Sequence, residues 1–135
     1  WDVSKVTTMA SMFSGATYFN QSLDNWDVSS VKTFRQAFWT TRSFNSSLGS
    51  WDVSRCTDMN SMFVGASSFQ QDLSHWNVSS VQDFSGMFYG AKNFESNLCS
   101  WDFGEARVRG MLLGTACPIT ADPTPDAACY PCIDL

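Results

Sequence analysis

Residues 1–26 read WDVSKVTTMASMFSGATYFNQSLDNW, and this stretch decides the fold because the chain repeats it. Tryptophan returns at a fixed interval of 25 residues, at Trp1, Trp26, Trp51, Trp76 and Trp101. A strict period of this length is typical of a protein built from stacked units, in which neighbouring units bury one another's apolar faces. Such proteins usually act through an extended surface, so we expect no single catalytic pocket.

Units begin at residues 1, 26, 51, 76 and 101. Tryptophan and two columns of phenylalanine recur once per unit and form the predicted repeat core: Trp26, Trp51, Trp76, Trp101, Phe13, Phe38, Phe63, Phe88, Phe19, Phe44, Phe69 and Phe94. A large apolar residue that recurs in register is what a stack of units must bury. We therefore favour core packing of the tryptophans over the alternative that they stack on sugar rings.

The fifth unit has drifted from the pattern. Gly104 replaces serine, Arg109 occupies a column of methionine and phenylalanine, and Leu113 continues the first phenylalanine column. Terminal units of a stack are expected to be atypical because one of their faces has no neighbour. We therefore divide the chain into a repeat region, residues 1–116, and a cysteine- and proline-rich C-terminal cap, residues 117–135.

Two segments of each unit carry secondary-structure signals. Four apolar residues of the first unit have the spacing of one helix face: Val6, Met9, Met12 and Phe13. Ser4 would cap the start of this helix, and Gly15 would end it in a left-handed conformation. Thr40 interrupts the glycine column, so the second helix is expected to end differently. Residues 23–28 suit a short strand. We predict an α/β fold with one short helix and one short parallel strand per repeat.

The pattern WDVSxVxxMxxMFxGAxxFNxxLxxW covers residues 1 to about 116 and resembles the BspA-like surface-protein repeats of bacteria, protists and algae, the tryptophan-headed type of mycoplasma lipoproteins. These repeats are similar to divergent leucine-rich repeats. The resemblance implies a right-handed, leucine-rich-repeat-like solenoid of five repeats. It also implies roles in surface display, adhesion and protein interaction, and it brings no catalytic residue and no cofactor.

Composition narrows the class of function. The net charge is −5 and the basic residues are scattered, which argues against a nucleic-acid partner. No apolar run approaches the ~20 residues that a membrane-spanning helix needs. The chain begins with Trp1 and not with methionine, which predicts a mature, trimmed or partial product that further repeats can precede.

Four cysteines, Cys99, Cys117, Cys129 and Cys132, cluster near the end of the chain. Four cysteines allow three pairings, and the sequence does not choose among them. We favour two disulfides formed in an oxidising compartment. A zinc site is the rival interpretation, because two of these cysteines form a CxxC motif. Cys56 stands in a column of valine and is predicted to be a buried free thiol.

Asn20, Asn45 and Asn77 each begin an Asn-X-Ser sequence, the acceptor for N-linked glycans. Asn20 and Asn45 share a repeat column, so their glycans would lie close together. An internal ladder of side chains bonded to backbone is the alternative for this column. Gln70 and Glu95 in the same column argue against a ladder, because both are longer and Glu95 is charged. We favour exposed asparagines that carry glycans.

The search for catalytic or metal chemistry is brief. His75 is the single histidine, and no Ser–His–Asp set can be assembled around it. One column is mostly aspartate and could bind Ca²⁺ between units: Asp2, Asp27, Asp52, Asn77 and Asp102. One carboxylate per unit is sparse for a cation that takes 6–8 oxygens. We favour a role for this column in backbone turns.

These observations favour a secreted or surface-exposed, non-enzymatic structural protein. The first unit presents an uncovered face, so we predict head-to-tail self-association into a fibre or surface assembly. The extended tail from Pro118, which ends in Ile133, Asp134 and Leu135, could reach onto a neighbouring copy or fold back on its own chain. The alternative is a monomeric adhesion or ligand-binding segment of a larger cell-surface protein, with another surface or matrix protein as its partner.

Overall fold

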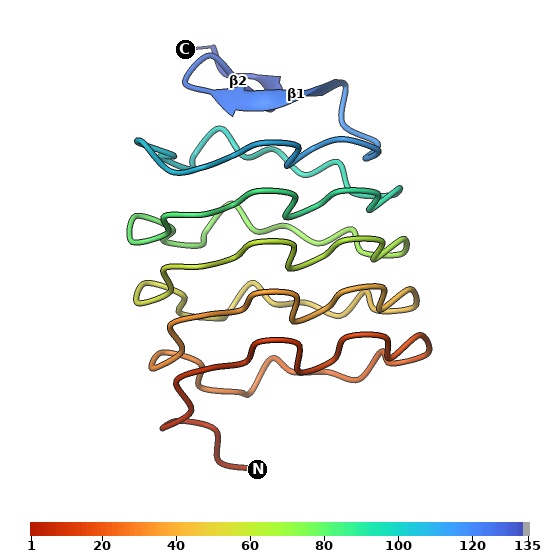
Figure 1. Cartoon of the computed structure of the whole chain (residues 1–135), viewed down its shortest axis with the longest axis vertical. Coiled ribbons are helices and arrows are strands. Elements are labelled where there is room, and N and C mark those ends of the chain that lie inside the picture. Colours follow the sequence, from red (N-terminus) through yellow and green to blue (C-terminus); the bar gives the residue numbers. More distant parts are fainter. Residues whose placement is uncertain (134–135) are drawn as a thin grey trace.

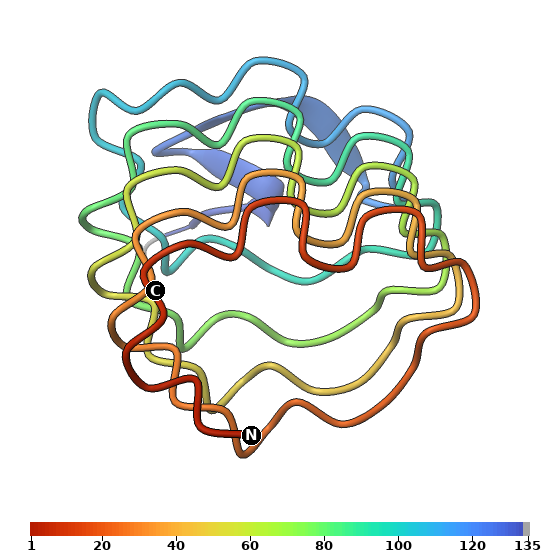
Figure 2. The same cartoon turned by 60° about the horizontal axis from the view of Figure 1, so that its bottom comes forward.

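The computed structural model describes residues 1–133 as a column of stacked coils (Figure 1). The chain passes around the column once per unit, so that equivalent residues of successive units lie above one another (Figure 2). Single parallel bridges join the units from Thr8 through Thr33, Asp58 and Asp83 to Arg107. An antiparallel hairpin of β1 (Ile119–Thr124) and β2 (Ala127–Pro131) closes the C-terminal end.

The predicted α/β solenoid, with a helix and a parallel strand in every repeat, is wrong. Residues 1–133 contain no helix, and their sheet is the antiparallel β1–β2 pair alone. The units therefore lack both elements on which the leucine-rich-repeat-like architecture was built. Ser4 is consequently no helix cap, and residues 23–28 form no strand.

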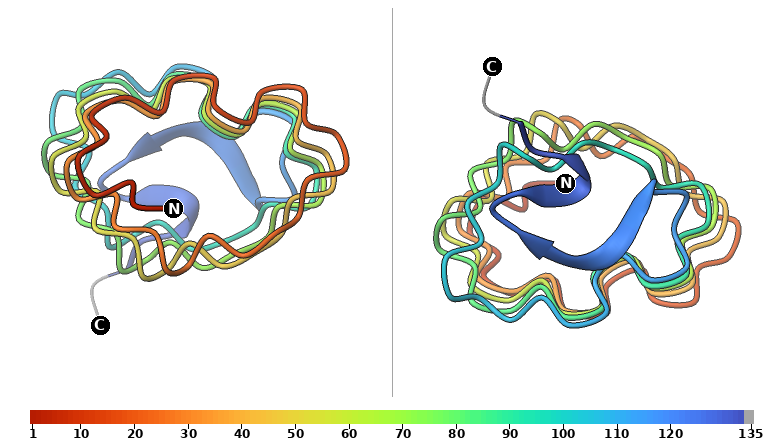
Figure 3. Two further views of the ribbon diagram at one scale, coloured as in Figure 1. Left: turned by 90° about the horizontal axis from the view of Figure 1, so that it is seen from below. Right: turned by 90° about the horizontal axis from the view of Figure 1, so that it is seen from above.

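Successive tight turns replace the expected helix. In the second unit, the inward residues follow one another at intervals of three or four: Val28, Val31, Phe34, Phe38, Thr41, Phe44, Leu48 and Trp51. Most pairs of successive inward residues are joined by one backbone hydrogen bond, as in Thr41 N–H to Phe38 C=O (3.1 Å) and Phe44 N–H to Thr41 C=O (3.2 Å). The same spacing of apolar residues marks a helix face, which explains the wrong prediction. The turns give each coil its scalloped outline (Figure 3).

Backbone bonds between units replace the bonds that a helix would make internally. Alternate amides of the second unit, those of Phe34, Gln36, Phe38 and Thr40, donate to carbonyls of the third unit at 2.7–3.0 Å. Each such bond contributes about 0.5–1.5 kcal/mol net. Gln36 (φ 57°) and Thr40 (φ 53°) adopt left-handed conformations, which turn alternate amides toward the next unit. Thr40 therefore behaves as Gly65 (φ 67°) does one unit later, contrary to the prediction of a different ending.

Aromatic rings stack along the inside of the column. The Phe63 ring lies 5.3 Å from Phe38 and 5.5 Å from Phe88, and the planes are nearly parallel. Phe44, Phe69 and Phe94 form a second stack, and Trp51, Trp76 and Trp101 form a third. Each of these three indole N–H groups donates to a leucine carbonyl at 2.9–3.0 Å, so burial leaves no indole donor unpaired. In the first coil, Phe13, Phe19 and Trp26 are half-buried.

The fifth unit is one residue shorter than the others. Arg107 donates its amide to the Gln82 carbonyl (3.0 Å) and accepts from the Phe84 amide (2.7 Å), two tasks that separate residues perform in earlier units. The register predicted beyond this point is therefore wrong by one residue. Leu112, fully buried, continues the phenylalanine column, whereas Leu113 is 48% exposed. Val108, not Arg109, likewise occupies the methionine and phenylalanine column.

The hairpin lies across the end of the column (Figure 3). Leu98 N–H donates to the Ala128 carbonyl (3.2 Å), which attaches β2 to the last complete unit. Gly110 N–H donates to the Asp122 carboxylate (2.8 Å), which attaches β1 to the fifth unit. One disulfide, Cys99–Cys132, links the cap covalently to the repeats, and a second, Cys117–Cys129, lies within the cap. Residues 117–133 thus cover the apolar rings that the last unit would otherwise expose.

Two glycines at equivalent positions allow a test of unit-to-unit contact. Gly15 (φ 75°) and Gly114 (φ 76°) are both left-handed, and alanine in that conformation costs about 1–2 kcal/mol. A Cβ on Gly114 would lie 3.2 Å from Cα of Gly90, whereas a Cβ on Gly15 meets no atom within 4 Å. We expect Gly114→Ala to lower the urea midpoint further than Gly15→Ala. Equal midpoints would contradict the close stacking of units four and five.

Candidate functional site

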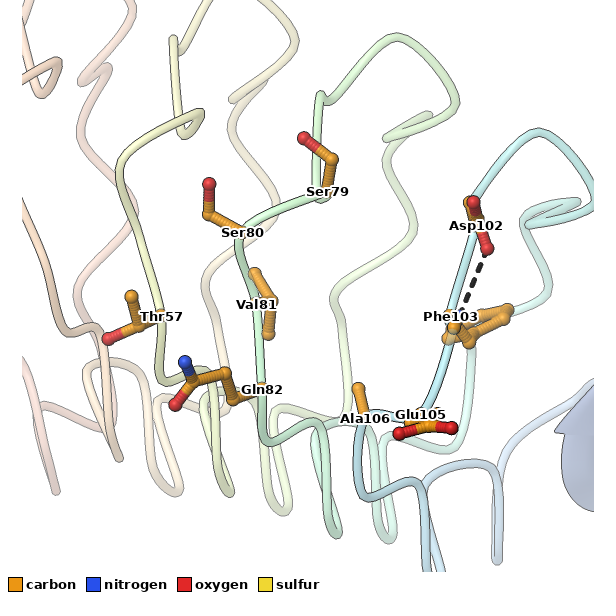
Figure 4. A pocket seen from close by; sticks show the side chains of 10 residues that line it. Thr57, Ser79, Ser80, Val81, Gln82, Asp102, Phe103, Glu105 and Ala106 are labelled. Carbon is orange, nitrogen blue, oxygen red and sulfur yellow. Dashed lines mark hydrogen bonds between the residues drawn. The ribbon is translucent and has the colours of Figure 1, made fainter.

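A hollow of about 610 Å³ opens where the fourth unit meets the shortened fifth unit (Figure 4). Its lining comes from one segment of each of these units together with a threonine of the third: Thr57, Ser79, Ser80, Val81, Gln82, Asp102, Phe103, Gly104, Glu105 and Ala106. The sequence did not predict this hollow. It lies where the repeat departs from its own pattern.

The missing atoms of the fifth unit account for the hollow. Gly104 stands where the other units carry serine, and no atom lies within 4 Å of the place where its Cβ would be. The unit is also one residue short between Ala106 and Arg107, as the backbone bonds of Arg107 show. Neighbouring units therefore cover one another less completely here than elsewhere in the column.

Polar side chains of the hollow are available to a ligand. Ser80, Gln82 and Glu105 are exposed, and their side chains make no hydrogen bond with the rest of residues 1–133. Ser79 differs, because its hydroxyl donates to the Asn77 side chain (2.7 Å). The Asp102 carboxylate accepts from the Gly104 amide (3.0 Å). The hollow can thus offer a hydroxyl, an amide and a carboxylate to a polar ligand, while His75 is not among its lining residues.

A second hollow of about 390 Å³ lies between the fifth unit and the hairpin. Its lining includes apolar residues from both sides, among them Trp101, Val108, Pro123 and Pro125. Phe103 belongs to the linings of both hollows and packs edge-to-face on Phe84, with ring centroids 5.3 Å apart. Phe103 therefore borders both the polar first hollow and the more apolar second hollow.

The aspartate column forms backbone turns. Each member accepts from the amide two residues further on, at 2.9–3.1 Å: Asp2, Asp27, Asp52, Asn77 and Asp102. Hydrogen bonds from the side chain and amide of Ser29 hold the pKa of Asp27 below its usual value, and Ser54 does the same for Asp52. Within residues 1–133, no three His, Cys, Asp or Glu side chains gather in a way that could hold a metal ion.

These lowered pKa values predict a loss of stability in acid. A carboxylate whose pKa is lowered in the folded state stabilises the fold above its unfolded value of 3.8, and this contribution disappears as the pH falls through the lower folded value. We expect the urea midpoint to fall below about pH 4. The urea midpoint of the double variant Asp27→Asn with Asp52→Asn should fall less in acid. Asparagine can form the same turn without a charge, because the Asn77 side chain accepts from the Ser79 amide (3.1 Å). An unchanged pH dependence would contradict this assignment.

The asparagine column forms the ladder that the sequence interpretation disfavoured. The side-chain oxygen of Asn20 accepts from the Asn45 amide (2.8 Å), that of Asn45 from the Gln70 amide (2.8 Å), and that of Gln70 from the Glu95 amide (2.9 Å). Asn20 and Asn45 are nevertheless exposed, and the ladder uses their oxygen atoms. A glycan is attached to the side-chain nitrogen. Ladder and glycan are therefore compatible, and glycosylation at Asn20, Asn45 and Asn77 stays a prediction.

The structure pairs the clustered cysteines as Cys99–Cys132 and Cys117–Cys129, one of the three possible pairings. All four thiols that a zinc ion would need are thus used in disulfides, which persist in oxidising compartments. Cys56 is buried and unpaired within the described residues. Residues 1–133 contain no helix that is long and apolar enough to cross a membrane.

The Cys56 thiol should be unreactive in the folded protein. Burial raises the pKa of this thiol to about 11, and reagents that attack thiols need the ionised form. We expect Ellman's reagent to titrate no thiol in the native protein at pH 8 and one after denaturation without reductant. One rapidly reacting thiol before denaturation would contradict the placement of Cys56 in the core.

Fold and sites together define a repeat protein of hydrogen-bonded turns, closed at its C-terminal end by a disulfide-linked hairpin. The family described as "Mycoplasma protein of unknown function, DUF285" matches residues 1–55 and, in an overlapping match, residues 23–117, and the chain belongs to this family. The matches end where the cap begins. No curated protein and no solved structure matches the chain.

Proposed function

We propose that the protein is a non-enzymatic, extracellular interaction protein of the BspA-like surface type, which binds a partner on the outer surface of its coils. Membership of the mycoplasma family and the two disulfides support this assignment. The hollow between the fourth and fifth units carries the proposal, because the side chains of Ser80, Gln82 and Glu105 are exposed there and make no hydrogen bond within residues 1–133. The proposed partner is a surface or matrix molecule with hydrogen-bond donors and acceptors.

Binding to immobilised matrix proteins and polysaccharides tests this function. We expect the protein to bind at least one member of such a panel in biolayer interferometry. The variant Gln82→Ala with Glu105→Ala should lose that binding. The matched control, Thr7→Ala with Lys5→Ala, removes the equivalent side chains of the first unit and should keep it. Binding that survives the first variant, or is lost equally in both, would contradict a role for the hollow.

Head-to-tail self-association is a second candidate, because one copy can meet the next through the same pairing of amides with carbonyls that joins successive units. Carbonyls of the first unit, those of Thr8, Ala10, Met12 and Ser14, have no donor within residues 1–133, although their equivalents in the second unit each accept a bond. At the other end, the amides of Val108, Leu112 and Gly114 have no acceptor among the same residues. The row of amides on the fifth unit and the row of carbonyls on the first unit are the same donors and acceptors that pair at each contact between neighbouring units. Trp1 (99% exposed) and Tyr18 (90%) add apolar surface to the first unit.

The hairpin is the obstacle to such stacking, because β1 and β2 occupy the layer above the fifth unit (Figure 1). The tail was expected to reach a neighbour or to fold back. Its described part folds back as the β1–β2 hairpin, and Asp134 and Leu135 lie outside the described residues. Multi-angle light scattering over a range of concentrations separates the two candidates. A mass that rises with concentration, and that Tyr18→Lys holds at the monomer value, would support self-association. A constant monomer mass would contradict it.

A further inference from the structure

A groove of about 290 Å³ crosses the second, third and fourth units, on residues different from those of the hollow described above. Each unit contributes two residues at equivalent positions: Thr40 and Arg42, Gly65 and Ser67, and Gly90 and Lys92. The groove therefore runs along the column from unit to unit. It follows the repeat, whereas the hollow at the fifth unit arises from a break in the repeat.

The groove carries positive charge without an internal partner. Arg42 and Lys92 are exposed, and neither forms an ion pair within residues 1–133, where the ion pairs join Arg35 to Asp58 and Arg107 to Asp83. The chain as a whole has a net charge of −5. Two uncompensated cations on one groove of an acidic protein favour an anionic ligand.

Backbone groups of the groove are also unpaired. The amides of Arg42, Ser67 and Lys92 make no hydrogen bond within the described residues, and neither do the carbonyls of Thr40, Gly65 and Gly90. Gly65 (φ 67°) and Gly90 (φ 71°) are left-handed, and a Cβ on either would lie against the preceding unit, 3.4 Å from Thr40 Cγ2 and 3.8 Å from the Gly65 nitrogen. Alternating donors and acceptors are what a peptide backbone presents, and a protein that binds an extended peptide satisfies both.

An apolar stripe borders the groove. Trp39, Val64 and Tyr89 directly precede the first groove residue of their units, and Leu113 continues this apolar stripe on the fifth unit. The side chains of Tyr89 and Leu113 are 53% and 48% exposed. A stripe of this kind can hold an apolar side chain of the same ligand, with the charged groups alongside.

We propose that this groove binds an extended acidic peptide that lies along the column from the second to the fourth unit. Its carboxylates pair with Arg42 and Lys92, and an apolar side chain packs on Trp39 or Tyr89. Arg42 and Lys92 are separated by two units, which stack 5.3 and 5.5 Å apart as judged by the Phe38, Phe63 and Phe88 rings. An extended residue rises about 3.3 Å, so the two carboxylates stand roughly three residues apart. The inference rests on the proposed interaction function and names a ligand class for a second surface.

Fluorescence anisotropy with a labelled synthetic peptide tests the inference. The peptide carries glutamate at every third position and a central tyrosine. Arg42→Ala with Lys92→Ala should bind it about tenfold more weakly than the parent protein, as expected for the loss of two exposed ion pairs. The control, Lys5→Ala with Lys32→Ala, removes the same charge from exposed positions elsewhere and should bind within about twofold. Equal losses in both variants, or no binding to the parent protein, would overturn the proposal.

Four further arms identify the ligand class and separate the groove from the hollow. The same peptide with glutamine in place of glutamate should not bind, and Arg42→Glu with Lys92→Glu should instead bind a lysine version of it. Heparin binding through Arg42 and Lys92 without peptide binding would assign the groove to a sulfated polysaccharide and overturn the peptide assignment. Gln82→Ala with Glu105→Ala should leave peptide binding unchanged, so failure of the groove and failure of the hollow are distinguishable.

Discussion

Phe63→Ala is expected to lower the free energy of unfolding by about 3–5 kcal/mol, as for other large-to-small changes in a well-packed core. Phe63 is fully buried in the central unit, and its ring lies 4.1 Å from Phe69 as well as between Phe38 and Phe88. The substitution therefore leaves a cavity that both adjacent units border. Urea unfolding followed by tryptophan fluorescence measures the change.

Ser80→Ala is the matched surface control. Its side chain is exposed and makes no hydrogen bond within residues 1–133, so the change should stay within about 0.5 kcal/mol. Similar midpoints for the Phe63 and Ser80 variants would contradict the placement of the phenylalanine column inside the column of coils.

The second large effect is expected when the link between the cap and the repeats is removed. Cys99→Ser with Cys132→Ser deletes a disulfide that spans 33 residues, and we expect a loss of about 2–4 kcal/mol. Most of this loss comes from the greater freedom of the unfolded chain, and the remainder from weaker attachment of β2. The measurement is urea unfolding under non-reducing conditions.

Cys56→Val provides the control for that experiment. Three other units carry valine at this position, and Cys56 makes no disulfide. This variant should unfold within about 1 kcal/mol of the parent protein. A larger loss for Cys56→Val than for the cap variant would show that the cap contributes little to the stability of the repeats.

The repeat made the alignment of side chains predictable, but not the backbone between them. Trp51, Trp76 and Trp101 can be aligned from the sequence alone, and in the structure they stack ring on ring. The spacing of Val6, Met9 and Phe13 fits both a helix face and successive turns with inward ends. Both place Gly15 in a left-handed conformation, so a left-handed Ser11 decides between the two, and serine gives little signal for that conformation.

The surface sites were harder to predict for two physical reasons. The hollow depends on one missing residue before Arg107, and the alignment of the fifth unit passed over this gap because an apolar residue, Leu113, fell in the expected column. The asparagine ladder was disfavoured because Gln70 is longer than asparagine, yet its longer side chain still reaches the Glu95 amide. Comparison of Arg42 with Lys92 as one repeat column could have revealed the groove from the sequence.

The central claim is that each unit bonds to its neighbours through alternate amides and forms no internal helix. Nuclear Overhauser measurements on an isotope-labelled sample test it most directly at the Phe38 amide, which donates to the Met62 carbonyl (2.8 Å). We predict contacts from this amide to the third unit, with non-helical Cα shifts at Gln36 and Thr40. A continuous run of helical shifts through the same residues, with contacts confined to their own unit, would contradict the account.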